Sequence, residues 1–146
     1  MNTIAFDCLN PEDRLSFSLY AASREIIKHY KPFLDRLDLT YTQYLTMALL
    51  WKAKSMTVKE IGDALYLDSG TLTPLLKKLE AKGYLTRIRS TTDERNLNVS
   101  VTENGMQLRE IAQTAAEEMG KSSPFTDKEE KNIYFFLEKV LEKAHD

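Results

Sequence analysis

Apolar positions recur at helical spacing along most of this chain, which predicts a largely helical protein. The first helix is expected to begin at Asn10-Pro11, where an N-cap residue and a proline are followed by the acidic Asp13. We expect this helix to run to about Leu37 and to bend at Pro32, because proline removes one backbone hydrogen bond.

Further helix starts carry their own capping residues. Thr40–Gln43 and Thr57–Glu60 are capping boxes, in which a threonine and the residue three positions later bond to each other's backbone. Asp68 precedes the next helix, which we expect to end at Gly83 because glycine accepts the left-handed conformation that follows many helices. The middle of the chain is therefore predicted to hold closely spaced helices.

The pattern changes after this glycine. Residues 84–90 and 97–102 alternate between apolar and polar side chains, which predicts two strands joined by the polar segment 91–96. Helical spacing returns at about Glu103, and a capping box at Thr126–Glu129 opens a last helix. Two short helices followed by a two-stranded wing are typical of a winged helix-turn-helix, so we predict a mainly α fold with a small β-wing.

Composition excludes several classes of protein. The 146 residues are 42% hydrophobic and 29% charged, which fits one globular domain over residues 1–146. No apolar run of about eighteen residues predicts a membrane span, and no secretory signal is recognisable at the start. With Cys8 as the single cysteine, no internal disulfide can form, so we expect a cytoplasmic protein. His29 and His145 are far apart and glycine-rich phosphate loops are absent, so we expect no metal, no cofactor and no catalytic site.

Charge is concentrated in one segment. The chain carries a net charge of −2, but residues 69–91 hold an excess of basic residues: Lys77, Lys78, Lys82, Arg87 and Arg89 against Glu80. Such a basic centre in an acidic body is expected of a protein that holds DNA locally, although a solvated charged surface has the same composition.

The helix from residue 69 to Gly83 is suited to a DNA groove. Its leucines fall on one stripe, and its hydroxyl and ammonium groups fall on the opposite side. Hydroxyl groups can bond base edges or phosphates, and lysines release counterions from DNA. Pro74 is unexpected within a helix, and nothing in the sequence explains it. Together with residues of the wing, the predicted DNA contacts are Ser69, Thr71, Thr73, Lys77, Lys78, Arg89, Asp93 and Arg95.

The tip of the predicted wing carries a possible minor-groove contact. Arg95 at the end of a hairpin can enter a narrow A·T-rich minor groove, where the negative potential is strongest. Asp93 can hold the guanidinium group in place by a bidentate ion pair. Taken alone, the same two residues also fit an exposed surface ion pair.

Two long stretches carry a resemblance to a known family. LYLDSGTLTPLLKKLEAKGYLTRIRSTTDERNLNVSVTENG closely resembles the recognition helix and wing of MarR-family transcription regulators. FSLYAASREIIKHYKPFLDRLDLTYTQYL is similar to the organic-hydroperoxide-sensing repressor branch and its staphylococcal global-regulator relatives. The resemblance implies an obligate homodimer on a pseudo-palindromic, double-stranded DNA operator, with dimerisation helices in residues 1–40 and 103–146 and a DNA-binding lobe in 41–102. It also implies that Arg95 reaches the minor groove.

The chain departs from that branch at its sensor. The family places a reactive cysteine in the first helix, in a Leu-Cys-Phe context, and here Ser16 occupies this position. The two tyrosines that bond the thiol across the family's dimer are retained as Tyr30 and Tyr41, and Tyr20 completes the expected sensor pocket. A serine hydroxyl does not follow the oxidation chemistry of a thiol. Three alternatives follow: the protein senses something else, Cys8 is the redox-sensing residue instead, or Ser16 is an engineered replacement of cysteine.

Three hypotheses remain open from the sequence. In the first, the protein is a DNA-binding repressor that responds to an oxidant through Cys8. In the second, the dimer senses a small apolar or phenolic effector between its helices, and Cys8 has no redox role. In the third, the winged helix is a surface that binds another protein rather than DNA.

Overall fold

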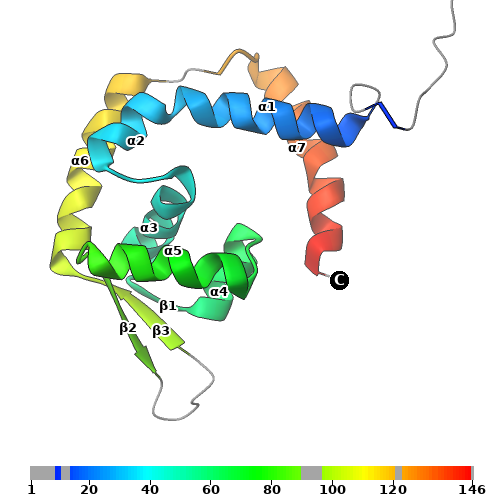
Figure 1. The fold of residues 1–146 in the computed structure, drawn as a ribbon. Helices are drawn as coiled ribbons and strands as arrows, with labels where there is room; N and C mark the ends of the chain where they lie inside the picture. Colours follow the sequence, from blue (N-terminus) through cyan, green and yellow to red (C-terminus); the bar gives the residue numbers. More distant parts are fainter. Residues whose placement is uncertain (1–8, 11–13, 90–96, 121–122, 146) are drawn as a thin grey trace, which may run out of the picture.

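The computed structural model describes residues 9–10, 14–89, 97–120 and 123–145, and it is mainly helical with one small antiparallel sheet (Figure 1). The predicted fold class is therefore confirmed. In chain order the elements are α1 (Leu15–His29), α2 (Lys31–Leu37), α3 (Tyr41–Ala53), β1 (Ser55–Thr57), α4 (Val58–Leu65), α5 (Ser69–Ala81), β2 (Leu85–Arg89), β3 (Leu97–Val101), α6 (Glu103–Met119), α7 (Asp127–Leu141) and a short 3₁₀ helix (Glu142–His145).

The expected long first helix is wrong in two respects. It is two helices, since α1 ends before Tyr30 and Pro32 lies in the first turn of α2, where a backbone N–H is not required. The described helix also begins later than predicted: Arg14 is extended and precedes α1, so Asn10 does not cap it. Residues 11–13, including the predicted first-turn acid, lie outside the described residues.

The other predicted helix starts are confirmed. Thr40, Thr57 and Thr126 each form a complete capping box at the start of α3, α4 and α7. The side chain of Asp68 accepts a hydrogen bond at the start of α5, and Gly83 follows that helix with a φ of +80°. Local chemistry therefore places these helix boundaries, as expected from capping energetics.

The sheet contains one strand that the pattern did not predict. The hairpin of β2 and β3 is confirmed, with Leu85 opposite Val101 and Arg89 opposite Leu97. β1 pairs with the other side of β3, which gives the order β1-β3-β2. Three residues are too few to show an alternating pattern, so only the pairing with β3 identifies β1 as a strand.

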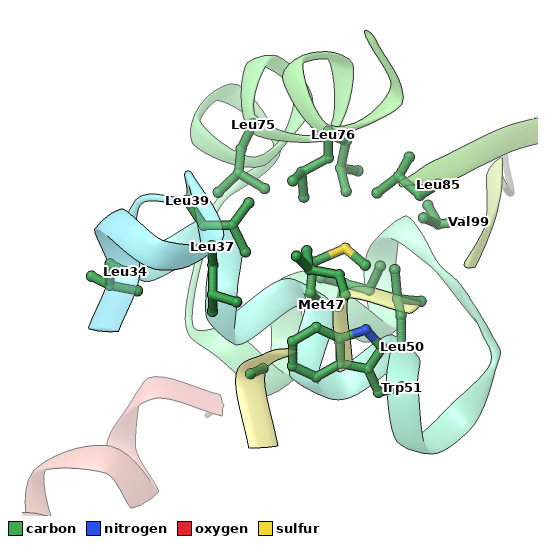
Figure 2. Packing of buried hydrophobic residues seen from close by; sticks show 14 of the residues in the cluster. Leu34, Leu37, Leu39, Met47, Leu50, Trp51, Leu75, Leu76, Leu85 and Val99 are labelled. Carbon is green, nitrogen blue, oxygen red and sulfur yellow. The ribbon is translucent and has the colours of Figure 1, made fainter. Parts of the chain in front are cut away.

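The core lies between α5 and α3 and is closed by α2, α6 and the sheet. In Figure 2, Leu75 and Leu76 of α5 point towards Met47 and Leu50 of α3, and Leu85 enters from β2. Buried leucines of α2 and buried alanines of α6 belong to the same core, so it includes residues on both sides of 41–102. The division into a DNA-binding lobe and dimerisation segments remains a prediction.

A buried hydrogen bond fixes α6 against α3. Trp51 Nε1 donates to the backbone oxygen of Gly105 at 2.8 Å. A side chain at Gly105 would collide with the backbone oxygen of Tyr84 and with Val101, so glycine allows α6 to start directly against the sheet. This contact places the base of the wing next to the core.

Neither α1 nor α7 has a buried residue, so neither helix adds a fully buried side chain to the core. In Figure 1, α1 lies on the side of the molecule away from the sheet, and α7 extends beside the core rather than covering it. None of the described helices is both long and apolar enough to cross a membrane.

Candidate nucleic-acid interface

The orientation of α5 is set by its leucines. Leu72, Leu75, Leu76 and Leu79 are buried, with exposures between 0% and 8%. A helix buried along one stripe turns its opposite face to solvent. Thr71, Lys77 and Lys78 are accordingly exposed, and Thr73 is half-buried at the edge of the leucine stripe.

The first turn of α5 presents polar groups at a capped helix end. Asp68 Oδ1 accepts a hydrogen bond from the backbone N–H of Thr71 at 2.7 Å. This bond, together with one from the Thr71 side chain, holds the pKa of Asp68 below its ordinary value. Asp68 and the neighbouring Ser69 are both exposed, so this end of the helix is open to a ligand.

Pro74 lies inside α5 and is exposed. As proline, it cannot donate a backbone hydrogen bond to the carbonyl oxygen of Gly70, one turn earlier. The structure gives no reason for proline at this position.

The basic residues of residues 69–91 divide into two groups. Lys82 Nζ bonds the backbone oxygen and a carboxylate oxygen of Asp38, and Arg87 is paired with Glu80. Among the residues that the structure describes, no ion pair is formed by Lys77, Lys78 or Arg89. A count of charges along the sequence does not distinguish these cations, whereas the fold leaves Lys77, Lys78 and Arg89 available to a polyanion.

The wing begins beside α5. Arg89 is exposed at the end of β2, opposite Leu97 at the start of β3. The predicted contacts Asp93 and Arg95 belong to the segment between these strands and lie outside the described residues, so their roles remain predictions.

The predicted sensor residues are only partly brought together. The rings of Tyr30 and Tyr41 pack edge-on with centroids 5.3 Å apart, and burial raises the pKa of Tyr41. Ser16 lies on α1, 14 residues before Tyr30, which is roughly 21 Å along the helix. Tyr20 is exposed and its hydroxyl accepts a bond from Arg24 at 2.8 Å.

One chain therefore does not form the complete predicted pocket. Cys8 lies outside the described residues. Two hollows on the surface are lined by other residues: one of about 410 Å³ along α6, and one of about 380 Å³ between α4, the start of α5 and the start of β3. Within the described part of the chain, no group of His, Cys, Asp and Glu could hold a metal ion.

The sequence alone did not identify the two ion pairs that hold the end of α5 in place. Lys82 and Glu80 connect the end of this helix to the corner between α2 and α3 and to β2, respectively. Their partners are known only once the elements are packed, because no short spacing rule links Lys82 with Asp38, 44 positions away. The basic excess in residues 69–91 indicated a DNA-binding region, but it did not indicate which cations form ion pairs within the protein.

The cap at Asp68 generates a pH prediction. Its lowered pKa means that the cap stabilises the folded state fully above the ordinary carboxyl pKa, and less as pH falls towards the lowered value. Asp68→Asn keeps a good capping residue that does not titrate. We expect the stability advantage of the natural chain over D68N, measured by urea unfolding, to shrink between about pH 5 and pH 3. Parallel stability curves for the two proteins would contradict this.

Comparisons with known proteins agree with this geometry. The family model for the transcriptional regulator SarA/Rot matches residues 28–111. An organic hydroperoxide resistance transcriptional regulator of Bacillus subtilis (strain 168) is 54% identical over 107 residues, which cover 73% of each chain. The regulator SarZ of Staphylococcus haemolyticus is 37% identical over 134 residues, covering 92% of this chain and 91% of SarZ.

Solved structures show the same fold. Reduced AbfR bound to DNA superposes with a TM-score of 0.79 at 34% identity, covering 92% of this chain and 94% of AbfR, a protein of Staphylococcus epidermidis. AbfR has also been solved in an overoxidized form bound to DNA and in a disulfide form. These relatives are regulators rather than enzymes. The chain belongs to the SarA/Rot family of MarR-like winged-helix transcriptional regulators.

Proposed function

We propose that the chain is a homodimeric transcription repressor that binds a pseudo-palindromic DNA operator and responds to oxidative stress. The observation that carries the DNA-binding part is the outer face of α5, where Lys77 and Lys78 are exposed and have no ion pair among the described residues. Arg89 adds a third such cation on the neighbouring strand.

These groups suit the two grooves of one duplex. α5 has the length and the polar outer face of a recognition helix in the major groove, with Ser69, Thr71 and Thr73 near its N-terminus. The lysines reach phosphates further along the helix. Arg89 leads into the wing, whose tip residues Asp93 and Arg95 are assigned to the adjacent minor groove.

Homodimerisation is supported by the apolar faces of α1 and α7. Leu15, Ile26, Phe136 and Val140 are each between 49% and 75% exposed. Large apolar side chains left exposed in this number indicate an interaction site, and their position on the first and last helices agrees with the dimer that the MarR resemblance implies. Two lobes joined in this way would read two half-sites about one helical turn apart.

Redox sensing rests on the relatives and on the lone thiol. The names of the Bacillus regulator and of the AbfR structures link those proteins to hydroperoxide resistance and to oxidized states. In this chain Ser16 cannot be oxidized like a thiol, so Cys8 is the residue that would react with a hydroperoxide. The Cys8 thiol would be oxidized to a sulfenic acid, and the hydroperoxide would be reduced to an alcohol. Since the relatives are bacterial and bacterial DNA lies in the cytoplasm, the proposal places the protein there.

The role of α5 is tested with Lys77→Ala. Loss of a phosphate contact weakens binding to all duplexes alike and makes the plot of log affinity against log salt shallower, by about 0.9 per lysine lost. Fluorescence anisotropy with a labelled duplex measures both. Arg109→Ala on α6 is the matched control, because it removes an exposed cation away from α5. Equal salt slopes for K77A and R109A would refute the assignment of α5.

The dimer is tested with Val140→Asp. A charge placed within the apolar face of α7 would be desolvated in the interface, so we expect V140D to be largely monomeric at concentrations where the natural chain is dimeric. Sedimentation velocity measures the two species. Lys131→Asp introduces the same side chain at a polar, exposed position of α7 and should remain dimeric. A dimeric V140D would show that this face is not the interface.

The signal is tested on the preformed protein–DNA complex. We expect an organic hydroperoxide to release the natural chain from DNA and to leave Cys8→Ser bound, as measured by anisotropy with mass spectrometry of the thiol. Equal release of both proteins would remove Cys8 from the mechanism. Release by a phenolic compound such as salicylate, with none by the hydroperoxide, would favour a small-molecule effector instead.

A further inference from the structure

Glu80 in the last turn of α5 forms an unusual ion pair with the wing. Its Oε1 accepts a hydrogen bond from Arg87 Nη2 at 3.1 Å, and its Oε2 accepts one from the backbone N–H of Arg87 at 3.1 Å. The side chain of Arg87 is only 19% exposed, the lowest value for any member of the described ion pairs. One carboxylate thus holds both the backbone and the side chain of a single strand residue.

The backbone contact closes an open sheet edge. β2 is the last strand in the order β1-β3-β2, so one side of it has no neighbouring strand. The N–H of Arg87 donates to Glu80 rather than to β3, and the carboxylate therefore takes the place that another strand's carbonyl would occupy. The contact attaches the middle of β2 directly to α5.

The guanidinium group depends on the same carboxylate. Nε of Arg87 is buried and has no hydrogen-bond partner among the residues that the structure describes. A partly buried cation whose carboxylate is removed is left uncompensated, which costs more than the loss of an exposed pair. Hydrogen bonding to Arg87 also holds the pKa of Glu80 below its ordinary value, which favours the charged carboxylate.

The rest of the junction does not hold the outer part of the strand. Gly83, with a φ of +80°, makes the turn from α5 into β2, and the buried Leu85 anchors the start of the strand in the core. Beyond Arg87, Ile88 is 64% exposed and Arg89 is exposed. The direction of this outer part is set by pairing with β3 and by Glu80.

We propose that Glu80 is a positioning residue for DNA binding, which holds the wing at the angle to α5 that lets Arg89 and Lys77 reach one duplex at the same time. The inference rests on the proposed function, and it adds a residue that does not itself touch DNA. A wing released from α5 would have to be ordered during binding, and that loss of conformational freedom lowers affinity.

A double-mutant cycle tests this positioning role. Glu80→Gln preserves size and removes the charge, and we expect it to weaken binding to an A·T-rich duplex about five-fold at low salt, where binding does not require the operator sequence. If Glu80 acts through the wing, Arg89→Ala should lower the affinity for the duplex several-fold in the natural chain but much less in E80Q. Lys77→Ala should cost the same in both backgrounds, because it lies on α5 itself. Glu110→Gln on α6 is the matched control and should leave affinity unchanged.

A merely structural role gives a different result. In that case E80Q lowers the unfolding temperature, but R89A and K77A each reduce DNA affinity as much in E80Q as in the natural chain. That result would overturn the positioning role.

A second measurement does not depend on DNA. Amide hydrogen exchange in E80Q should become faster at residues 86–89 and 97–99 and stay unchanged in α3, and unchanged exchange in the wing would overturn the inference. If the natural chain binds no duplex while E80Q still loosens the wing, the proposed function fails and the mechanical link between Glu80 and the wing stands.

Discussion

Burial of the leucine face of α5 against α3 is the constraint on which the candidate interface depends. Leu76 is essentially inaccessible and faces the equally buried Met47 and Leu50 (Figure 2), and Leu79 is fully buried in the same core. Turning the helix to expose these side chains would return a large apolar area to water, at about 25 cal/mol per Å². The burial therefore selects Lys77 and its neighbours as the outer face, without any contribution from their own charge.

Ion pairs at the end of α5 extend this constraint to the rest of the molecule. Lys82 bonds Asp38 in the corner between α2 and α3, and Glu80 bonds Arg87 on β2. Although most surface ion pairs contribute little to stability, these two connect elements whose relative position matters for a groove-binding protein. Lys82 and Arg87, which a charge count would assign to DNA, instead form ion pairs within the protein.

The two ends of the chain follow a different physical rule. Their helices have exposed apolar faces but no fully buried residue within one subunit, and the predicted sensor residue Ser16 on α1 is far from Tyr30, which follows that helix. Both facts point outside the single chain, since an apolar face and an incomplete pocket are each completed by a second copy in the proposed dimer. The family that the chain belongs to fits this view, and Ser16 is where the chain differs from the branch it resembles.

The sequence by itself determined most helix boundaries, the β2–β3 hairpin and the two faces of α5. Capping at Thr40, Thr57, Asp68 and Thr126 is a local interaction, and periodicity along one helix needs no knowledge of its neighbours. The break at Tyr30 was missed because a proline is accepted in the first turn of a helix as readily as it bends one, and the pattern does not distinguish the two cases.

Only the tertiary structure decided which cations are free, where β1 pairs and which carboxylate holds the wing. Lys82 with Asp38, Met56 with Val99 and Glu80 with Arg87 are brought together by the packing of separate elements. An ion pair or a strand pairing between such elements has no periodic trace in the sequence. Its energy depends on distance and burial, and both are set only when the core closes.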